Sequence, residues 1–454
     1  MAELSLNDAL KLAVKSHTEG KLQQAEYLYR KILEINPNNA NALHLFGVIA
    51  HQMGRHEESI KYIKKAIKLN PNAAFYYGNL AMAYDSLGKE EESASNFIRA
   101  LEIDPKYDKA YLAHYNLSVF YMDKRKINEA IEHYNKAIEL NGDFFDAYWN
   151  RGLALLLLGR FKEGFEGYEY RFKKEDPSDS RIFGKPKWDG SSLNGKRILI
   201  LSEQGFGDNI NFARYASLVK DRGGYVILEC KKELRRLFEN LKGLDKIILK
   251  EKGIMPNIEF DFYIHLMSLP RIFDTSLNNI PNTSPYLRAD FELVKKFKEK
   301  FNSNNFKIGI VWAGNPNQEN DKNRSTTFEK FKVLKEIPGS ELVSLQVGKA
   351  SCQLNDLSVI DVSNEITDFA DTAAVIANLD LVISVDTSVA HLAGATGKPI
   401  WMLLSYVHDL RWMLDRRDSV WYDSMKLFRQ PKLGDWDSVF NDVSNELKNL
   451  LRSR

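Results

Sequence analysis

The chain has 454 residues, which exceeds one ordinary globular core and predicts two or three domains. Its 63 basic and 61 acidic side chains leave a formal charge of +2, so no overall field favours nucleic acid or an anionic membrane. Two distant cysteines, Cys230 and Cys352, argue against a disulfide framework or zinc site and fit a reducing compartment. No apolar run approaches about 18 residues, and no secretion signal opens the chain. We expect a cytoplasmic protein without membrane span, metal, cofactor or nucleic-acid partner.

The first third of the chain is periodic. Gly20, Gly54 and Gly88 recur every 34 positions, each at the bend between two helical patterns. Pro37, Pro71 and Pro105 recur with the same spacing, each at the end of a repeat. Gly159 continues the glycine series after a three-residue slip in the fourth repeat. This period is that of paired-helix repeats, and roughly residues 6 to 172 resemble the tetratricopeptide family. We therefore predict an α-solenoid over residues 1–172.

The sixth position of the first helix is asparagine in three successive repeats, at Asn79, Asn116 and Asn150. These side chains should line the concave face, where a carboxamide can hydrogen-bond an extended acceptor peptide whatever its sequence. Asparagine is also common at this position as a polar residue compatible with a helix. Both interpretations are open.

After a connector at residues 173–196, which contains two prolines and several glycines, the pattern turns α/β. Apolar strand patterns without polar alternation occur in two series: 197–202, 225–230, 246–250 and 260–266, then 307–312, 341–347, 381–385 and 399–404. Such strands are typical of parallel sheets covered on both faces. We predict two lobes, at 197–290 and 291–454, with a charged helix at 290–301 between the series. Ligands should bind beyond the carboxyl ends of the strands.

The loop after the first strand reads SEQGFGDNINFARY, residues 202–215. Gly205 and Gly207, which follow Gln204, allow close approach of the backbone to a ligand in the cleft. Asp208 lies where a helix begins, and its carboxylate is a candidate base. Alternatively, Asp208 only caps the helix, since the glycines form an incomplete GxGxxG pattern.

The loop at 312–331 follows the first strand of the second series. Lys322, Arg324, Ser325 and Thr326 gather cations and hydroxyls before a helix, which suits the departing phosphate of a nucleotide sugar. The alternative is a solvated charged loop. We favour phosphate contact because the loop follows a buried strand.

The third loop, within LVISVDTSVAHLAGATGKPIWMLL at 381–404, is the most informative. A buried strand delivers Asp386, and Thr387 and Ser388 open a short helix that carries His391. The unpaired N–H groups of a helix N-terminus suit a pyrophosphate, and the hydroxyls add donors. The alternatives are that Asp386 only caps the helix and that His391 belongs to the core.

Together, residues 166 to 440 resemble the catalytic region of bacterial heptosyltransferase-related glycosyltransferases, particularly those fused behind tetratricopeptide repeats, as in flagellin glycosyltransferases. The motifs that carry the resemblance, in chain order, are EQGFGD (203–208), HLMSLP (265–270), VWAGNPNQENDKNRS (311–325), SLQVG (344–348), SVDTSVAHLAGATGKP (384–399) and DWDSVF (435–440). The resemblance implies an inverting, metal-independent reaction in the GT-B-type fold of two Rossmann-like lobes. It also implies a final helix near 436–452 that crosses back toward the first lobe.

By this resemblance Asp208 matches the aspartate proposed as catalytic base, and DTSVAH matches the donor-nucleotide motif. Lys322 and Arg324 would occupy the phosphate-facing loop. The matched motifs add Asn315 and Gln346 to the candidate donor-binding residues. Animal O-GlcNAc transferases share the overall plan, although these motifs are closer to the heptosyltransferases. Some repeat-fused relatives use sialic-acid-like sugars carried on cytidine monophosphate, so the nucleotide stays open.

We therefore expect transfer of a sugar from a nucleotide donor to a Ser or Thr hydroxyl of a protein recruited by the repeats, flagellin among the candidates. One alternative is a repeat scaffold with a degenerate nucleotide-binding region. Another is a transferase that acts on a saccharide or lipid-linked glycan.

Overall fold

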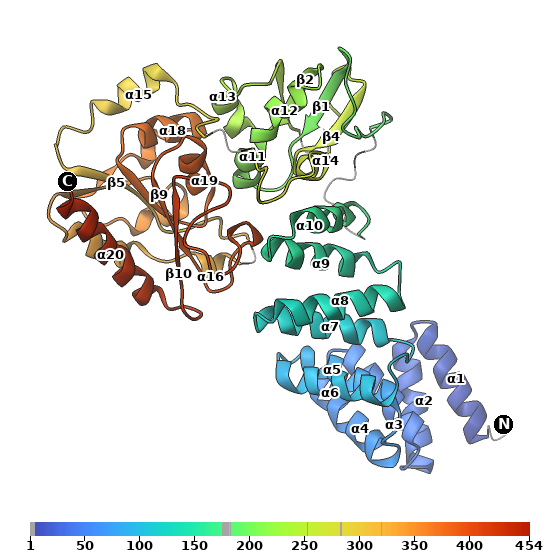
Figure 1. Cartoon of the computed structure of the whole chain (residues 1–454). Coiled ribbons are helices and arrows are strands. Elements are labelled where there is room, and N and C mark those ends of the chain that lie inside the picture. The colour runs from blue at the N-terminus through green and yellow to red at the C-terminus, as the bar shows by residue number, and fades with distance from the viewer. Residues whose placement is uncertain (1–4, 175–180, 182, 252, 282–283, 319) are drawn as a thin grey trace. The chain divides into compact units, whose positions relative to one another are not determined.

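The computed structural model describes residues 5–174, 181, 183–251, 253–281, 284–318 and 320–454, so part of the predicted connector lies outside the described residues. The chain forms two compact units, Met1–Ala154 and Leu155–Arg454. Helices make up the described part of the first unit, and the second unit contains two parallel sheets (Figure 1).

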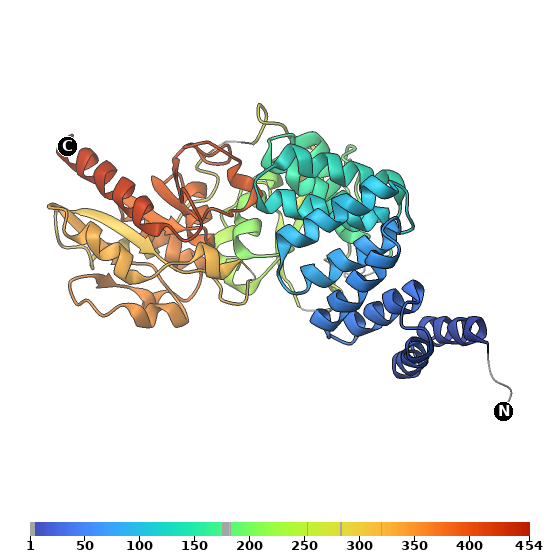
Figure 2. The same cartoon turned by 90° about the horizontal axis from the view of Figure 1, so that it is seen from below.

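The first unit is a stack of antiparallel helix pairs, which confirms the predicted tetratricopeptide solenoid (Figure 2). Its helices are α1 (Leu6–Thr18), α2 (Leu22–Ile35), α3 (Ala40–Gln52), α4 (His56–Leu69), α5 (Ala74–Asp85), α6 (Glu90–Ile103), α7 (Ala110–Asp123), α8 (Ile127–Leu140) and the first part of α9 (Phe145–Leu157). Gly54 turns the chain between α3 and α4 at φ +77°, a conformation that costs glycine little. Arg125 adopts φ +57° between α7 and α8, so the fourth repeat keeps its turn without glycine.

The helical pattern of the repeats continues into the second unit. There α10 (Phe161–Tyr168) and the 3₁₀ turn η1 (Glu169–Phe172) precede the first sheet. Gly164 allows α10 to approach the preceding helix, because an added Cβ would lie 2.6 Å from the Leu156 side chain. The sequence places the repeats at 1–172, whereas the compact units divide between Ala154 and Leu155.

The first lobe of the second unit is built on a parallel sheet of order β3-β2-β1-β4. Its strands are β1 (Arg197–Leu201), β2 (Tyr225–Cys230), β3 (Lys246–Leu249) and β4 (Phe262–His265). Its helices and 3₁₀ turns are α11 (Phe206–Phe212), η2 (Ala213–Tyr215), α12 (Ala216–Lys220), η3 (Lys232–Leu234), α13 (Arg235–Phe238), η4 (Leu266–Ser268) and α14 (Leu269–Ile272). Residues 198–201 of β1 are fully buried, as expected for a central strand covered on both faces.

The second lobe has a parallel sheet of order β10-β9-β8-β5-β6-β7. Its strands are β5 (Phe306–Val311), β6 (Ser340–Ser344), β7 (Ile360–Asp361), β8 (Leu381–Val385), β9 (Ile400–Leu404) and β10 (Met425–Arg429). Its helices and turns are α15 (Phe291–Lys298), α16 (Asp321–Arg324), α17 (Phe328–Lys335), η5 (Lys349–Gln353), η6 (Ser363–Glu365), α18 (Phe369–Ala377), α19 (Ser388–Ala395), η7 (Leu410–Trp412) and α20 (Trp436–Arg452). The two sheets confirm the predicted fold class.

The final helix α20 differs from its expected course. Instead of crossing back toward the first lobe, its apolar face packs on the core of the second lobe, where the rings of Phe440 and Phe331 lie 4.8 Å apart. Val443 and Leu447, one and two helical turns further on, are fully buried in the same core. The apolar face of α20 is thus buried against its own lobe.

Candidate active site

The loops that follow β1, β5, β8 and β9 lie at the carboxyl ends of their strands, where ligands of doubly wound folds bind. Two of these loops lead into α11 and α19, and these two helices pack on each other across the lobes. Gly207 makes the contact possible, since a Cβ there would lie 2.7 Å from Cδ2 of His391. The first and third predicted loops are therefore brought together.

Asp208 points from α11 toward the second lobe. Its carboxylate forms an ion pair with Arg411, which follows β9, and it also accepts a hydrogen bond from the Gly205 N–H at 2.8 Å. Asp208 therefore both caps its helix and faces the opposite lobe, so the two interpretations of the sequence are compatible. Burial raises the pKa of Asp208, and the charge of Arg411 opposes that rise. A buried carboxylate of raised pKa is suited to accept a proton.

Arg411 and its neighbours were missed by the sequence analysis. Arg411 also pairs with Asp409 at 2.9 Å, and the Trp412 indole N–H donates to Asp386 at 2.8 Å. Burial, followed by the charge of Asp409, raises the pKa of Asp386 to about 6. A signal was present in the sequence, because the charged string DLRW follows the buried strand β9 by a few residues.

The loop after β5 is fixed by internal hydrogen bonds. Arg324 donates to the backbone oxygen of Asp386 at 3.1 Å, and Ser325 accepts from the Gly314 N–H at 2.9 Å. An added Cβ at Gly314 would lie 2.4 Å from the Arg324 guanidinium, so this glycine makes room for the arginine. Arg324 is thereby placed beside the turn that opens α19.

The other predicted residues of this region differ in placement. Lys322 and Asn315 are exposed, and Asn315 caps its own turn by accepting from the Asn317 N–H at 3.1 Å. Gln346 is buried, and its Oε1 accepts the N–H groups of residues 312 and 313 at 3.0 and 2.9 Å. The Gln346 amide thus holds the loop in shape, and any effect on a ligand would pass through that shape.

The start of α19 carries the predicted hydroxyls. Thr387 is buried with its hydroxyl 3.0 Å from that of Ser384, whereas Ser388 is half-buried in the first turn of the helix. His391 is buried, and its Nδ1 lies 2.9 Å from the Tyr422 hydroxyl. Burial, with the charge of Arg411, lowers the pKa of His391 well below its usual value, so the imidazole is neutral. The position of His391 matches the interpretation as a core residue.

The loop that carries Asp208 is anchored to the last repeat helix. Gln204, at φ +57°, donates to the Tyr168 hydroxyl at 2.6 Å. Next to it, the buried carboxylate of Glu203 accepts two hydrogen bonds from Arg171, at 2.8 and 3.0 Å. A buried bidentate pair of this kind has one preferred geometry, so α10 and η1 fix the start of the candidate site.

In the first unit, all three predicted asparagines contact a neighbouring repeat. The Asn79 amide lies 2.8 Å from Nε2 of His44, and the Asn150 amide donates to the Tyr115 hydroxyl at 2.8 Å. Asn116 donates to a backbone oxygen of its own helix at 2.8 Å, and its amide nitrogen also lies 3.9 Å from the sulfur of Met82 in the preceding repeat. Asn79 also lines a cavity of about 370 Å³ with Phe75, Tyr107 and Lys109, among others.

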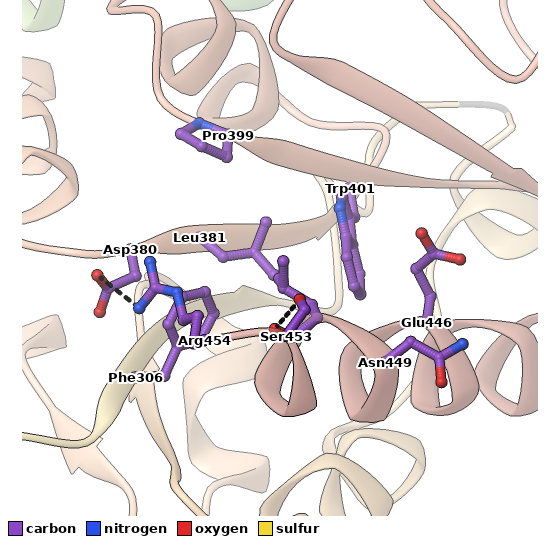
Figure 3. Close-up of a pocket in the computed structure, with 10 residues that line it drawn as sticks. Phe306, Asp380, Leu381, Pro399, Trp401, Glu446, Asn449, Ser453 and Arg454 are labelled. Carbon is purple, nitrogen blue, oxygen red and sulfur yellow. Dashed lines mark hydrogen bonds and ion pairs between the residues drawn. The ribbon is translucent and has the colours of Figure 1, made fainter.

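A larger cavity, of about 460 Å³, lies at the other end of the second sheet (Figure 3). Phe306 and Leu381, which line it, are the first residues of β5 and β8, so this cavity is at the amino ends of the strands. Arg454 covers the Phe306 ring at 4.2 Å. The cavity is therefore separate from the loops described above.

Within the described residues, no cluster of three or more histidine, cysteine or acidic side chains is arranged to hold a metal ion. No helix in this described part of the chain is both long enough and apolar enough to span a membrane.

Comparisons with known proteins define the class of both regions. Residues 361–412 match the model of glycosyltransferase family 9 (heptosyltransferase), and residues 38–106 and 120–159 match tetratricopeptide repeat models. The matched segment of the transferase family runs from β7 through α18, β8, α19 and β9 to Trp412. The chain therefore contains tetratricopeptide repeats and, in its second lobe, a segment that matches glycosyltransferase family 9.

Among individual proteins, Protein FlbA of Caulobacter vibrioides is 29% identical over 384 residues, which cover 77% of this chain and 63% of FlbA. An uncharacterised protein of Methanocaldococcus jannaschii is 43% identical over 53 residues, 12% of this chain and 62% of that protein. The chain thus spans less than two thirds of the length of these relatives. The crystal structure of MamA protein is similar at 26% identity and a TM-score of 0.32, over 38% of this chain and 96% of that chain.

Proposed function

We propose that this chain is an inverting, metal-independent glycosyltransferase that moves a sugar from a nucleotide donor to a Ser or Thr hydroxyl of a protein. The observation that carries the proposal is the packing of α11 on α19, which pairs Asp208 of one lobe with Arg411 of the other, while Arg324 donates to Asp386 at the turn that opens α19. A proton acceptor thus faces an anion-binding helix terminus, which is the arrangement that transfer from a sugar phosphate requires. The match of α19 and its flanking strands to glycosyltransferase family 9 supports the same activity.

In the proposed step the acceptor hydroxyl oxygen forms a bond to the anomeric carbon of the sugar. The bond from that carbon to the phosphate oxygen breaks, and its electron pair leaves with the nucleotide. Asp208 takes the hydroxyl proton, while Arg324, Ser388 and the N–H groups at the start of α19 stabilise the charge on the departing phosphate. Attack opposite to the leaving group inverts the configuration at the anomeric carbon.

Substitution of the base tests the proposal. Asp208→Asn keeps the shape and the Gly205 contact but removes the proton acceptor, so transfer should fall by about 10²-fold or more. The measurement is the rate of sugar transfer to a protein acceptor, with anomeric configuration read by NMR and a parallel assay in excess chelator. Asp442→Asn, an exposed change on α20, is the matched control and should leave the rate unchanged. Full activity of the Asp208→Asn protein would exclude Asp208 as the base.

The repeats are proposed to recruit the acceptor through the surface around Asn79. The cavity there places aromatic side chains beside Lys109 and the Asn79 amide, so apolar and hydrogen-bonding groups of a peptide would both be served. Flagellin stays one candidate acceptor.

A further inference from the structure

Arg411 occupies a position that the proposed reaction has not yet used. Its side chain is only 10% exposed, and it pairs with Asp208 of the first lobe and Asp409 of its own loop. The guanidinium also lies over the Phe212 ring at 5.7 Å. Its Nε–H is buried and has no hydrogen-bond partner among the described residues. A buried N–H without an acceptor is costly, so this donor is available to an incoming anion.

The surroundings of Arg411 are those of the donor site. The next residue, Trp412, bonds Asp386 at the turn that opens α19, and its indole lies 5.2 Å from the His391 ring. Arg324 reaches the same turn from the loop after β5. Two arginines from different loops therefore converge on the start of one helix, which itself favours anions.

We propose that Arg411 binds the phosphate that departs with the nucleotide, and that it releases Asp208 when it does so. The inference rests on the proposed transferase function. A phosphate offers the guanidinium several charged oxygens in a matching fork, so it competes well with the Asp208 carboxylate. Once Arg411 turns to the phosphate, Asp208 keeps the Gly205 N–H and faces the carboxylates of Asp409 and Glu203. The base thus becomes stronger when the donor is bound.

Competition between the two partners gives a result that a merely structural ion pair would not. Asp208→Asn should raise the affinity of the full chain for the anion by about 3- to 10-fold, because Arg411 no longer has to leave a carboxylate. Arg411→Ala should lower that affinity by about 10- to 100-fold. The measurement is titration calorimetry with inorganic pyrophosphate and with uridine, cytidine, guanosine and adenosine diphosphates and cytidine monophosphate.

A double variant distinguishes weaker anion binding from failure of the Arg411→Ala protein to fold. Arg411→Ala alone leaves Asp208 buried without its cation, whereas Arg411→Ala with Asp208→Asn removes both charges and should fold. The double variant should bind as weakly as Arg411→Ala, because the gain at Asp208 acts through Arg411. Arg416→Ala is the matched control, since it removes a cation of the same loop that pairs with Asp418 near the surface, and it should bind like the wild type.

The outcomes separate two failures. Wild-type protein that binds none of these probes and transfers no sugar would overturn the proposed function and this inference together. Wild-type binding with unchanged affinity in Asp208→Asn, or a double variant that keeps the gain, would overturn the role of Arg411 alone and leave the transferase standing.

Discussion

At the scale of single residues, two largely buried ion pairs of the second unit differ in what they can do. Arg171 and Glu203 hold each other through two hydrogen bonds in a buried setting, which favours one geometry. Asp208 and Arg411 share a pair across two lobes, and Arg411 has a spare buried donor. The first pair is suited to position a loop, and the second to respond to a ligand.

Protonation of His44 gives a prediction for the first unit. Burial, followed by the charges of Lys109 and His17, lowers the pKa of His44 to about 3, and Asn79 contacts its Nε2 at 2.8 Å. In the unfolded chain the histidine titrates near its ordinary value of about 6.5. Below that pH the unfolded chain binds a proton that the folded chain does not, so stability falls as pH falls from about 6.5 toward 3.

Between pH 7 and 5 this group alone should cost about 2 kcal/mol of the free energy of unfolding. Urea denaturation of wild type and His44→Gln at both pH values, followed by circular dichroism, measures the difference. The substituted protein should lose less stability on acidification. Equal losses in the two proteins would show that His44 titrates normally in the folded state.

Residue chemistry limits what the sequence predicts of the site. Asp208 and Asp386 could be selected because each closely follows a buried strand, and Arg324 because it lies with other polar residues in the loop after one. Arg411 also follows a buried strand, but its pairing could not be predicted, since its partner Asp208 is 203 residues away and no periodic pattern marks the loop between β9 and β10. His391 sits in the predicted motif, yet only the fold reveals that its ring is packed between Gly207 and Tyr422.

At the scale of elements, the candidate site depends on how closely α11 approaches α19. The contact is made where Gly207 faces the His391 ring, and the ring is held from behind by Tyr422. Close approach keeps Asp208 within reach of Arg411. A larger residue at 207 therefore has to move either the helix or a buried ring.

Gly207→Ala tests this contact. Its Cβ would lie 2.7 Å from Cδ2 of His391, so the free energy of unfolding of the second unit should fall by about 1–3 kcal/mol. Sugar transfer should fall with it, because Asp208 is displaced. Gly142→Ala is the control, since an added Cβ there meets nothing within 4 Å. Chemical denaturation and transfer rate are measured on the same preparations, and an unchanged Gly207→Ala protein would mean that the helices can separate freely.

Elements with a clear apolar or periodic pattern were predictable, and the edge strand β10 was not. The 34-residue spacing predicts the repeats, and continuous apolar runs predict the buried strands. β10 (Met425–Arg429) was missed because it is short and mixes basic with apolar residues, as an edge strand does. The expected course of α20 came from the resemblance, and its five buried apolar side chains pack on the core of the second lobe instead.

At the scale of the whole molecule, the boundary between the compact units lies within the repeats, before the α/β region begins. The last repeat helix and η1 belong to the second compact unit, and they supply Tyr168 and Arg171 to the loop that carries Asp208. We therefore assign two roles to the repeat region. Its earlier repeats are proposed to bind the acceptor, and its final turn supports the candidate base.

Two truncated chains test these two roles separately. A chain that begins at Asp143 keeps α9, α10 and η1, so it should still transfer sugar to a small hydroxyl acceptor but lose most transfer to the protein acceptor. A chain that begins at Lys173 lacks Arg171, which leaves Glu203 buried without its cation. Loss of a buried partner is strongly destabilising, so this second chain should lose transfer to every acceptor.

Transfer rates with a peptide-free saccharide or a simple alcohol, and with the protein acceptor, are compared for the two truncations and the full chain. Circular dichroism reports folding, and Arg171→Ala in the full chain reproduces the lost contact without any truncation. If the longer truncation still glycosylates the protein acceptor at the full rate, the repeats of the first unit do not recruit it. If the chain from Lys173 is fully active, the support that η1 gives to the Asp208 loop is dispensable, and the two regions would act as separate modules.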